Sequence, residues 1–467
     1  MKSQAMSAVD HAWYRMDSPE NLMMVHAIMW TEQPLDWDRV RAEIGSQMLQ
    51  RFPKFRQHPV PAGIPFGRAG WHEDEDFDLD RHIIVRQLRL DGDQQDGNQQ
   101  EAAVAALAAY VSSQIPLPLD PNHPMWQVHF LDGFGEGSAV LFRMHHSIAD
   151  GITLTRVLLS LTSSDTTHAG FLANKPRNRV AQLVDLTRAL GSEGLRRLRA
   201  PGRTLAAATT GVRGVRRLAQ LAAIPAKPRS ALAGEIGVAK QVTWTDPWPL
   251  QLVKRISRGS GVTVNDVLLS VLADALGRYL TEHGTPLDLV RVMVPVNLRP
   301  LDQPLPSDLG NIFGEYVVTL PTAEMDPLTR LARMHEITTD LKDSPEAVVA
   351  YLTLVAIGSL PDRVEDLSTK LFSGKIVATV SNVPGPRSRV QLAGTPVTGI
   401  IGWVPAAGDV GLGVSMFSYN DTVLVGLIAD ELLIGDLARL RELLAISFTE
   451  LADRAEADAL VEVASMG

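Results

Sequence analysis

Two adjacent histidines, His145 and His146, stand shortly before an Asp-Gly pair, Asp150 and Gly151. The alternating residues 138–144 predict a half-buried strand, and the apolar spacing after Gly151 predicts a helix. The histidines therefore lie where a strand ends. A neutral imidazole, with an ordinary pKa of roughly 6.5, can take a proton from a hydroxyl near neutral pH. Neighbouring side chains on a strand point to opposite sides, so one ring can face a given cleft, and we assign the role of general base to His146.

The histidine pair and Asp150 also allow interpretations other than base catalysis. Asp150 either holds an imidazole ring directly or fixes the loop by pairing with an arginine. A zinc site needs further ligands, but the chain has no cysteine and its other ten histidines are scattered singly. The remaining alternative is a pair of histidines buried in a core for structural reasons.

The pattern His-His-x-x-x-Asp-Gly resembles the signature of the CoA-dependent acyltransferase superfamily. Further stretches narrow the resemblance to the bacterial wax ester synthase/diacylglycerol acyltransferase family. Pro124-Met125-Trp126 departs mildly from the Pro-Leu-Trp of this family and keeps the tryptophan. The matching stretches span nearly the whole chain in the family's order: residues 6–13, 118–126, 263–267, 309–314, 381–386 and 413–419.

This resemblance implies an α/β fold of two chloramphenicol-acetyltransferase-like, mixed-sheet domains with the active-site channel between them. It implies acyl transfer from acyl-CoA to diacylglycerol or a long-chain alcohol, with acyl-CoA as a substrate and no metal or bound cofactor. In that scheme His146 removes the hydroxyl proton, and His145, Asp150 and Gly151 complete the catalytic motif. The alternatives are a small alcohol, polyketide or amine acceptor, or a non-catalytic protein of lipid surfaces.

Three residues are candidates for supporting the site. By resemblance to condensation domains, an arginine of the segment 51–57 pairs with the motif aspartate, and we expect this to be Arg56. A surface position for Arg56 is the alternative. Thr263 followed by Asp266 predicts a capping box at a helix start, which gives Asp266 a structural role. Asn265, beside the same helix N-terminus, is a candidate donor to an oxyanion.

Length and composition limit the function classes. With 467 residues, 45% hydrophobic and 21% charged, the chain is expected to form about two globular domains. We place them at residues 1–180 and 236–467, joined by a basic helical linker at 181–235. The absence of cysteine excludes disulfides and suits a cytoplasmic protein. We expect neither a secretion signal nor a spanning helix, and a net charge of -9 argues against nucleic-acid binding.

One segment departs from this acidic average. Residues 171–230 hold thirteen Lys or Arg against Asp185 and Glu193. Leucine and valine residues interleave with the arginines, which favours basic amphipathic helices. Such helices bind anionic membrane surfaces, so residues 175–229 are candidates for peripheral contact with a membrane or lipid droplet. A solvated connector and attraction of the CoA phosphates are the alternatives.

The remaining pattern predicts alternating strands and helices. The stretch 381–386, Ser-Asn-Val-Pro-Gly-Pro, is expected to be a fixed turn. The predicted strands are 22–30, 81–86, 125–130, 138–144, 240–244, 289–297, 311–320, 376–380, 410–418 and 423–429. The predicted helices are 36–50, 101–115, 249–258, 267–280, 327–342, 347–360 and 435–452.

Overall fold

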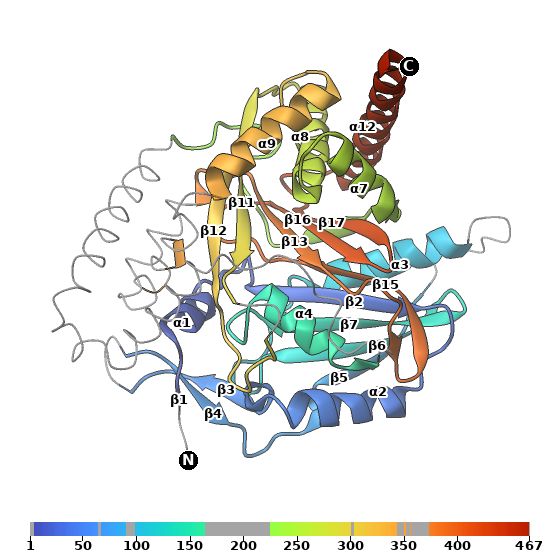
Figure 1. Cartoon of the computed structure of the whole chain (residues 1–467). Helices are drawn as coiled ribbons and strands as arrows, with labels where there is room; N and C mark the ends of the chain where they lie inside the picture. Colours follow the sequence, from blue (N-terminus) through green and yellow to red (C-terminus); the bar gives the residue numbers. More distant parts are fainter. Residues whose placement is uncertain are drawn as a thin grey trace, which may run out of the picture.

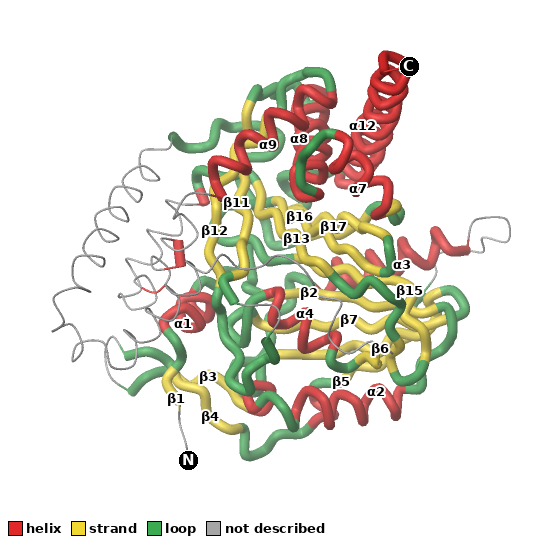
Figure 2. Tube along the Cα trace, viewed as in Figure 1, coloured by secondary structure: helices red, strands yellow, loops and turns green. Residues whose placement is uncertain are grey.

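The computed structural model describes residues 4–63, 67–89, 99–163, 225–299, 303–342, 350–351, 355 and 373–466. Within these ranges the chain forms two seven-stranded mixed sheets and one three-stranded sheet, with helices packed around them (Figures 1 and 2). The predicted α/β class with two mixed sheets is confirmed.

The first large sheet carries the histidine motif. Its strand order is β5-β6-β7-β2-β15-β14-β8, and β5 and β6 pair in parallel while the others pair antiparallel. Every residue of β7 is buried, so the strand is not half-buried as predicted. The bounds are β2 (Met24–Thr31), β5 (Ile83–Gln87), β6 (Trp126–Phe134), β7 (Gly137–His145), β8 (Thr162–Ser163), β14 (Gln391–Leu392) and β15 (Thr395–Trp403).

Helices cover both faces of this sheet, which explains the burial of β7. Adjacent residues on β6 point to opposite faces. Phe130 stacks on Trp37 of α2, whereas the side chain of His129 bonds to Tyr110 of α3. In Figure 1, α4 lies in front of the sheet and α3 behind it. The bounds are α1 (Ala8–Arg15), α2 (Trp37–Glu43), continued by the π-helical segment Ile44–Leu49, α3 (Gln99–Gln114) and α4 (Gly151–Leu159).

The second large sheet belongs to the later half of the chain. Its order is β10-β17-β16-β13-β11-β12, with β9 also paired to β17, and helices α7, α8, α9 and α12 lie above it in Figure 1. The bounds of its strands are β9 (Lys240–Trp244), β10 (Trp248–Pro249), β11 (Leu289–Asn297), β12 (Phe313–Pro321), β13 (Ala378–Pro384), β16 (Leu412–Tyr419) and β17 (Thr422–Asp430). Those of its helices are α7 (Leu250–Gly259), α8 (Val264–Glu282), α9 (Pro327–Lys342) and α12 (Leu437–Met466).

The three-stranded sheet is small and lies near the N-terminus. It joins β1 (Gln4–Ala5), β4 (Gly70–Glu73) and β3 (Gln57–Val60). A short 3-10 helix, Pro53–Arg56, leads into β3. This helix carries Arg56, the basic residue that the sequence analysis singles out.

Strand β15 crosses from the later half of the chain into the first sheet. It pairs antiparallel with β2, with Ile401 opposite Ile28. The sequence analysis predicts no strand here, and its turn at 381–386 is partly wrong. Ser381 to Pro384 continue β13 and pair in parallel with β16. The two sheets meet where the Ser415 hydroxyl of β16 donates to the Gly402 carbonyl of β15.

Some predicted elements cannot be compared. Residues 164–224, with most of the basic segment and linker, and most of the predicted helix 347–360 lie outside the described residues. Among the described helices, none alone has the length and hydropathy to span a membrane, although α7 and α8 together pass this test across a 99° bend.

Candidate active site

His146 follows the last residue of β7 and is enclosed by aromatic rings. Its ring stacks on Trp13 of α1 at 4.3 Å and packs against Phe313 of β12 at 5.8 Å. The residue is 6% exposed, and its Nδ1 atom has no hydrogen-bond partner. The protein therefore leaves one ring nitrogen, the buried Nδ1, without a hydrogen-bond partner.

This enclosure controls the protonation of His146. Burial lowers the imidazole pKa to about 4, against the opposing effect of the Asp150 carboxylate; the neighbouring His145 lowers it further. At neutral pH the ring is uncharged, which is the form that accepts a proton.

His145 has a different environment from its neighbour. Its Nδ1 lies 2.8 Å from the Ser147 hydroxyl, and its Nε2 lies 3.2 Å from a carboxylate oxygen of Asp17. Both ring nitrogens thus have partners, and the ring fixes the end of β7. The geometry favours His146 over His145 as the base.

Asp150 fixes the loop through backbone groups. One carboxylate oxygen accepts from the Thr153 amide at 2.8 Å and caps α4, and the other accepts from the Ile312 amide at 3.1 Å. The carboxylate thus connects the histidine loop to the later half of the chain. Arg156 of α4 is near enough for Asp150 to raise its pKa, although burial and Arg299 lower that pKa overall.

The predicted pair of Arg56 and Asp150 is wrong. Arg56 ends the short helix before β3 with its side chain 43% exposed, and its Nε lies 3.6 Å from Glu73. Because β3 and β4 pair beside this helix, Arg56 is directed towards β4 and away from the histidine loop.

Lys54, two residues earlier, is the buried cation of this segment. Its ammonium donates to Asp10 at 2.9 Å and to the carbonyls of Leu309 and Ile148 at 2.6 and 3.4 Å. Asn311 donates through its side chain to Asp10 and to the His146 carbonyl, at 2.9 Å each. We call Asp10, Lys54 and Asn311 the polar clasp.

The sequence analysis assigns no role to the polar clasp, Trp13 or Phe313. The signal was present in part, because Asp10 and Trp13 lie in the motif 6–13, and Asn311 and Phe313 in the motif 309–314. Spacing does not reveal that these two motifs come together at the histidine loop, where Asn311 donates to Asp10 and Trp13 packs against Phe313.

The structure places Asn265 and Asp266 at the start of α8. Asp266 is fully buried and forms the predicted capping box with Thr263, which is confirmed. It also accepts from His335 at 2.8 Å and Thr338 at 2.6 Å; burial opposes its ionisation, but these hydrogen bonds hold its pKa below the usual range. Asn265 accepts a hydrogen bond from Asn382 of β13 at 3.1 Å, so its oxyanion role stays a prediction.

An apolar cavity begins beside the histidine loop. Its space, counted to the open mouth, is about 660 Å³, and both sheets contribute to its walls. A Cβ atom on Gly151 would meet no atom within 4 Å, so this glycine leaves room at the cavity wall. The other walls include Val25, Ala27, Met29, Phe142, Met144, Leu154, Leu158, Val383, Ile401, Trp403, Met416 and Phe417.

Together these features can support base catalysis on a lipid-like substrate. An uncharged imidazole with an unpartnered nitrogen lies five residues before Gly151, which lines a cavity suited to an alkyl chain. In the described part of the chain, no group of three His, Asp or Glu residues could hold a metal ion.

Comparison with known families gives two matches along the chain. The profile of the wax ester synthase/diacylglycerol acyltransferase catalytic domain matches residues 6–268. The profile of the WS/DGAT C-terminal domain matches residues 309–452.

Individual relatives and solved structures agree with these matches. A probable diacylglycerol O-acyltransferase of Mycobacterium tuberculosis is 30% identical over 71% of this chain and 74% of its own length, and a second is 26% identical over 85% and 84%. The wax ester synthase/diacylglycerol acyltransferase from Marinobacter aquaeolei has a TM-score of 0.67 at 22% identity, covering 97% of this chain and all of its own. A condensation domain of the calcium-dependent antibiotic synthetase has a TM-score of 0.63 at 13% identity, covering 97% of each chain.

Proposed function

Because the chain belongs to the wax ester synthase/diacylglycerol acyltransferase family, we propose that it is an acyl-CoA-dependent O-acyltransferase. It transfers a fatty acyl group to diacylglycerol or a long-chain alcohol and produces triacylglycerol or a wax ester. The observation that carries this proposal is the enclosed, uncharged His146 with a free Nδ1 near the apolar cavity.

The reaction needs one base and one leaving group. His146 removes the proton from the acceptor hydroxyl, and the resulting alkoxide oxygen attacks the thioester carbonyl. The tetrahedral intermediate collapses with cleavage of the carbon–sulfur bond, and the CoA thiolate takes up the proton that His146 received. The apolar cavity holds the acyl chain, and the polar clasp positions the His146 loop.

The test is release of free thiol from palmitoyl-CoA in the presence of hexadecanol, dipalmitin or no acceptor. His146→Ala should lower the acceptor-dependent rate by about 10²- to 10⁴-fold, as expected for loss of a general base. His72→Ala removes a histidine outside the site, on β4, and is the matched control. Unchanged thiol release in His146→Ala would refute the assignment, and no release with either lipid would direct the search to smaller acceptors.

Peripheral contact with lipid is a separate part of the proposal. It is supported by the excess of arginine in residues 175–229. Residues 175–224 of this segment lie outside the described part of the chain. Replacing Arg196, Arg197 and Arg217 by glutamate should reduce co-flotation with vesicles containing anionic lipid. Turnover of soluble short-chain substrates should persist in this variant, and loss of both properties would contradict a role confined to the lipid surface.

A further inference from the structure

The wall that the second large sheet contributes to the apolar cavity carries two neighbouring serines. Ser381 of β13 and Ser415 of β16 lie opposite each other in the parallel pairing of these strands, and both line the cavity. The Ser415 hydroxyl is occupied, because it donates to the Gly402 carbonyl. The Ser381 hydroxyl makes no hydrogen bond within the described part of the chain, although the residue is only 6% exposed.

The other polar side chains of the cavity wall are not free to bind a ligand. Thr155 donates to the Gly151 carbonyl at 2.7 Å, and the unpartnered Nε1 atom of Trp403 is sealed from the cavity. The oxygen of Ser381 is not sealed in this way. Because buried hydroxyl groups are normally hydrogen-bonded, we expect Ser381 to bind a polar atom of a molecule in the cavity.

Ser381 lies towards the end of the second large sheet that meets the histidine loop. Asn297, at the C-terminal end of β11, pairs with Phe313, whose ring packs against His146. Strand β13 runs parallel to β11, so its C-terminal end points towards the same side of the sheet. Ser381 comes after the residues of β13 that pair with β11, in that direction.

The apolar cavity itself passes the same loop. Met144 and Gly151, which precede and follow His146 in the chain, both line it. The serine hydroxyl therefore shares a cavity with the two segments that flank His146. The residue after the serine, Asn382, points to the opposite face of β13 and donates to Asn265, and neither lines the cavity.

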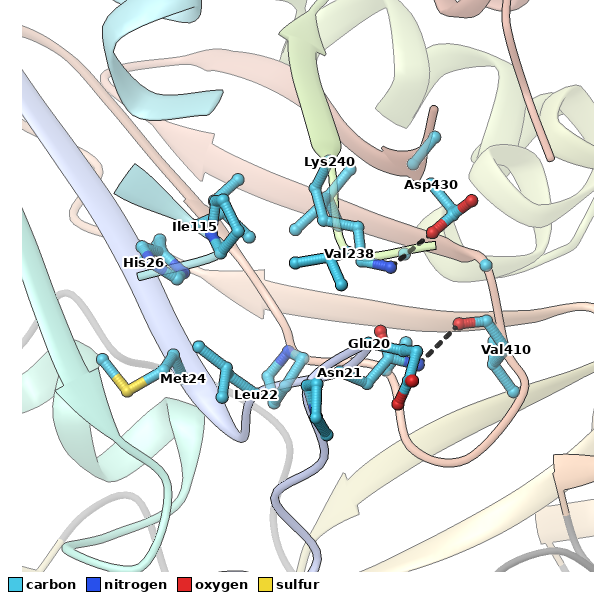
Figure 3. A pocket seen from close by; sticks show the side chains of 18 residues that line it. Glu20, Asn21, Leu22, Met24, His26, Ile115, Val238, Lys240, Val410 and Asp430 are labelled. Carbon is cyan, nitrogen blue, oxygen red and sulfur yellow. Dashed lines mark hydrogen bonds and ion pairs between the residues drawn. The ribbon is translucent and has the colours of Figure 1, made fainter. Parts of the chain in front are cut away.

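A second pocket, on the opposite face of β2, differs in this respect. Figure 3 shows the Lys240 ammonium in this pocket, paired with Asp430 at 2.5 Å. Asn21 donates to the Val410 carbonyl at 3.2 Å. The ring nitrogens of His26 have no partner but are sealed from the pocket. The side-chain donors of this pocket are thus bonded within the protein or sealed, unlike the serine of the apolar cavity.

The kind of atom that Ser381 binds follows from its surroundings. The walls around it are largely apolar, so a charged head group would lose its hydration without a compensating partner. A carbonyl oxygen accepts a hydrogen bond from a hydroxyl. Such a bond strengthens when negative charge develops on the oxygen, because an apolar cavity screens the charge weakly.

We propose that the Ser381 hydroxyl binds the thioester carbonyl oxygen of acyl-CoA and stabilises the negative charge that this oxygen gains during acyl transfer. When the acceptor oxygen bonds to the carbonyl carbon, the π electrons of the C=O bond move to the oxygen held by Ser381. They return when the carbon–sulfur bond breaks, and Ser381 keeps its proton throughout. The charge stabilisation rests on the proposed function, whereas the hydrogen bond to bound acyl-CoA does not.

Steady-state kinetics of the full chain with palmitoyl-CoA test the role in the reaction. Ser381→Ala should lower kcat about 10²-fold, the loss expected for one oxyanion donor, and change KM for palmitoyl-CoA little. The loss should be equal with hexadecanol and with dipalmitin, because the thioester carbonyl is common to both reactions, whereas dipalmitin alone brings ester carbonyls. A loss confined to dipalmitin, or a change in KM alone, would overturn the proposal.

Stability separates this role from a structural one. Ser381→Ala removes a hydroxyl that no protein group holds, so the midpoint of urea denaturation should match that of wild type. Ser415→Ala is the matched control on the neighbouring strand, and it loses the hydrogen bond to Gly402. It should lower the midpoint but reduce kcat less than Ser381→Ala does. The reverse order would show that Ser381 acts on the fold and not on the substrate.

Infrared spectroscopy tests the hydrogen bond without turnover. The probe is palmitoyl-CoA labelled with carbon-13 at the thioester carbonyl and bound to the His146→Ala variant. Adding Ser381→Ala should shift the carbonyl band to higher wavenumber, because a hydrogen bond weakens the C=O bond. An unchanged band would refute the proposal. If wild type releases no thiol with either acceptor, the proposed function fails, and this band still decides whether Ser381 binds the carbonyl.

Discussion

At the scale of single residues, the enclosure of His146 determines the pH range of the enzyme. Burial lowers its pKa to about 4, so the ring stays in its proton-accepting form well below neutral pH. We therefore expect kcat/KM for soluble substrates to be constant from pH 8 to 6 and to fall only as the pH approaches 4. Initial rates after brief pH jumps measure this profile, and an acid limb near 6.5 would show that the ring is solvated.

Asp150→Asn tests the electrostatic part of the same argument. The Asp150 carboxylate raises the His146 pKa, so its removal should move the acid limb to still lower pH. Asparagine keeps an oxygen that can cap α4. A shift to higher pH would contradict the assigned direction.

Lys54 and Arg56, two basic residues of the segment 51–57, should differ in their contribution to stability. Lys54→Met leaves the Asp10 carboxylate buried without its ammonium partner, which typically costs about 3–5 kcal/mol of unfolding free energy. Arg56→Met removes an exposed contact with Glu73, worth about 0–1 kcal/mol. Chemical denaturation of both variants measures the difference.

Activity gives this comparison a second readout. Because the polar clasp holds the His146 carbonyl through Asn311, Lys54→Met should also lower kcat more than it raises KM. Arg56→Met should be close to wild type. Equal effects of the two substitutions on stability and kcat would contradict the buried position of Lys54.

At the scale of elements, the pairing of β15 with β2 depends on close packing at Gly399. A Cβ atom there would lie 1.9 Å from a ring carbon of Trp30. Gly399→Ala should therefore lower the unfolding free energy by about 1–3 kcal/mol, as overpacking of a core does. Gly259→Ala, where a Cβ would meet nothing within 4 Å, is the control. Equal stability of the two variants in urea would refute this account of the crossing.

Elements with regular periodicity could be predicted from the sequence. Alternation predicted β7, and the Thr263 and Asp266 pair predicted the start of α8. β15 was missed because Gly399 and Gly402 interrupt its apolar pattern and because its partner β2 lies far away in the sequence. Periodicity indicates which face of an element is buried, but it does not indicate the partner.

The candidate active site was likewise only partly predictable from the sequence. The histidine motif predicted the position of His146 at a strand end, and the resemblance implied that an arginine of the segment 51–57, Arg56, pairs with Asp150. That pairing was wrong because the turn of one short helix places Arg56 towards Glu73 and Lys54 inward, where it pairs with Asp10.

At the scale of the whole molecule, the site depends on both halves of the chain. Asp10 and Lys54 come from the first half, while Asn311 and Phe313 come from the second, and all lie around the loop of His146 and Asp150. The crossing of β15 into the first sheet holds the two halves together. Catalytic geometry and global stability are therefore coupled.

The buried histidines make that stability depend on pH. Burial lowers the pKa of His129 to about 3 and that of His146 to about 4, whereas both titrate near 6.5 when the chain is unfolded. Between about 6.5 and 4 the unfolded state binds these protons and the folded state does not, so stability is lost as the pH falls. Each histidine should contribute a slope of about 1.4 kcal/mol per pH unit in this window.

Urea denaturation at pH 7.5, 6.0 and 5.0 measures this dependence. From pH 6.0 to 5.0 these two residues together should lower the unfolding free energy of wild type by about 2.4 kcal/mol, because the unfolded histidines are already partly protonated at pH 6.0. His129→Gln removes one titrating group and should reduce the slope by about 1.4 kcal/mol per pH unit, because glutamine does not titrate. A variant with the wild-type slope would mean that His129 is already protonated in the folded enzyme, and that the face of β6 towards α3 admits water.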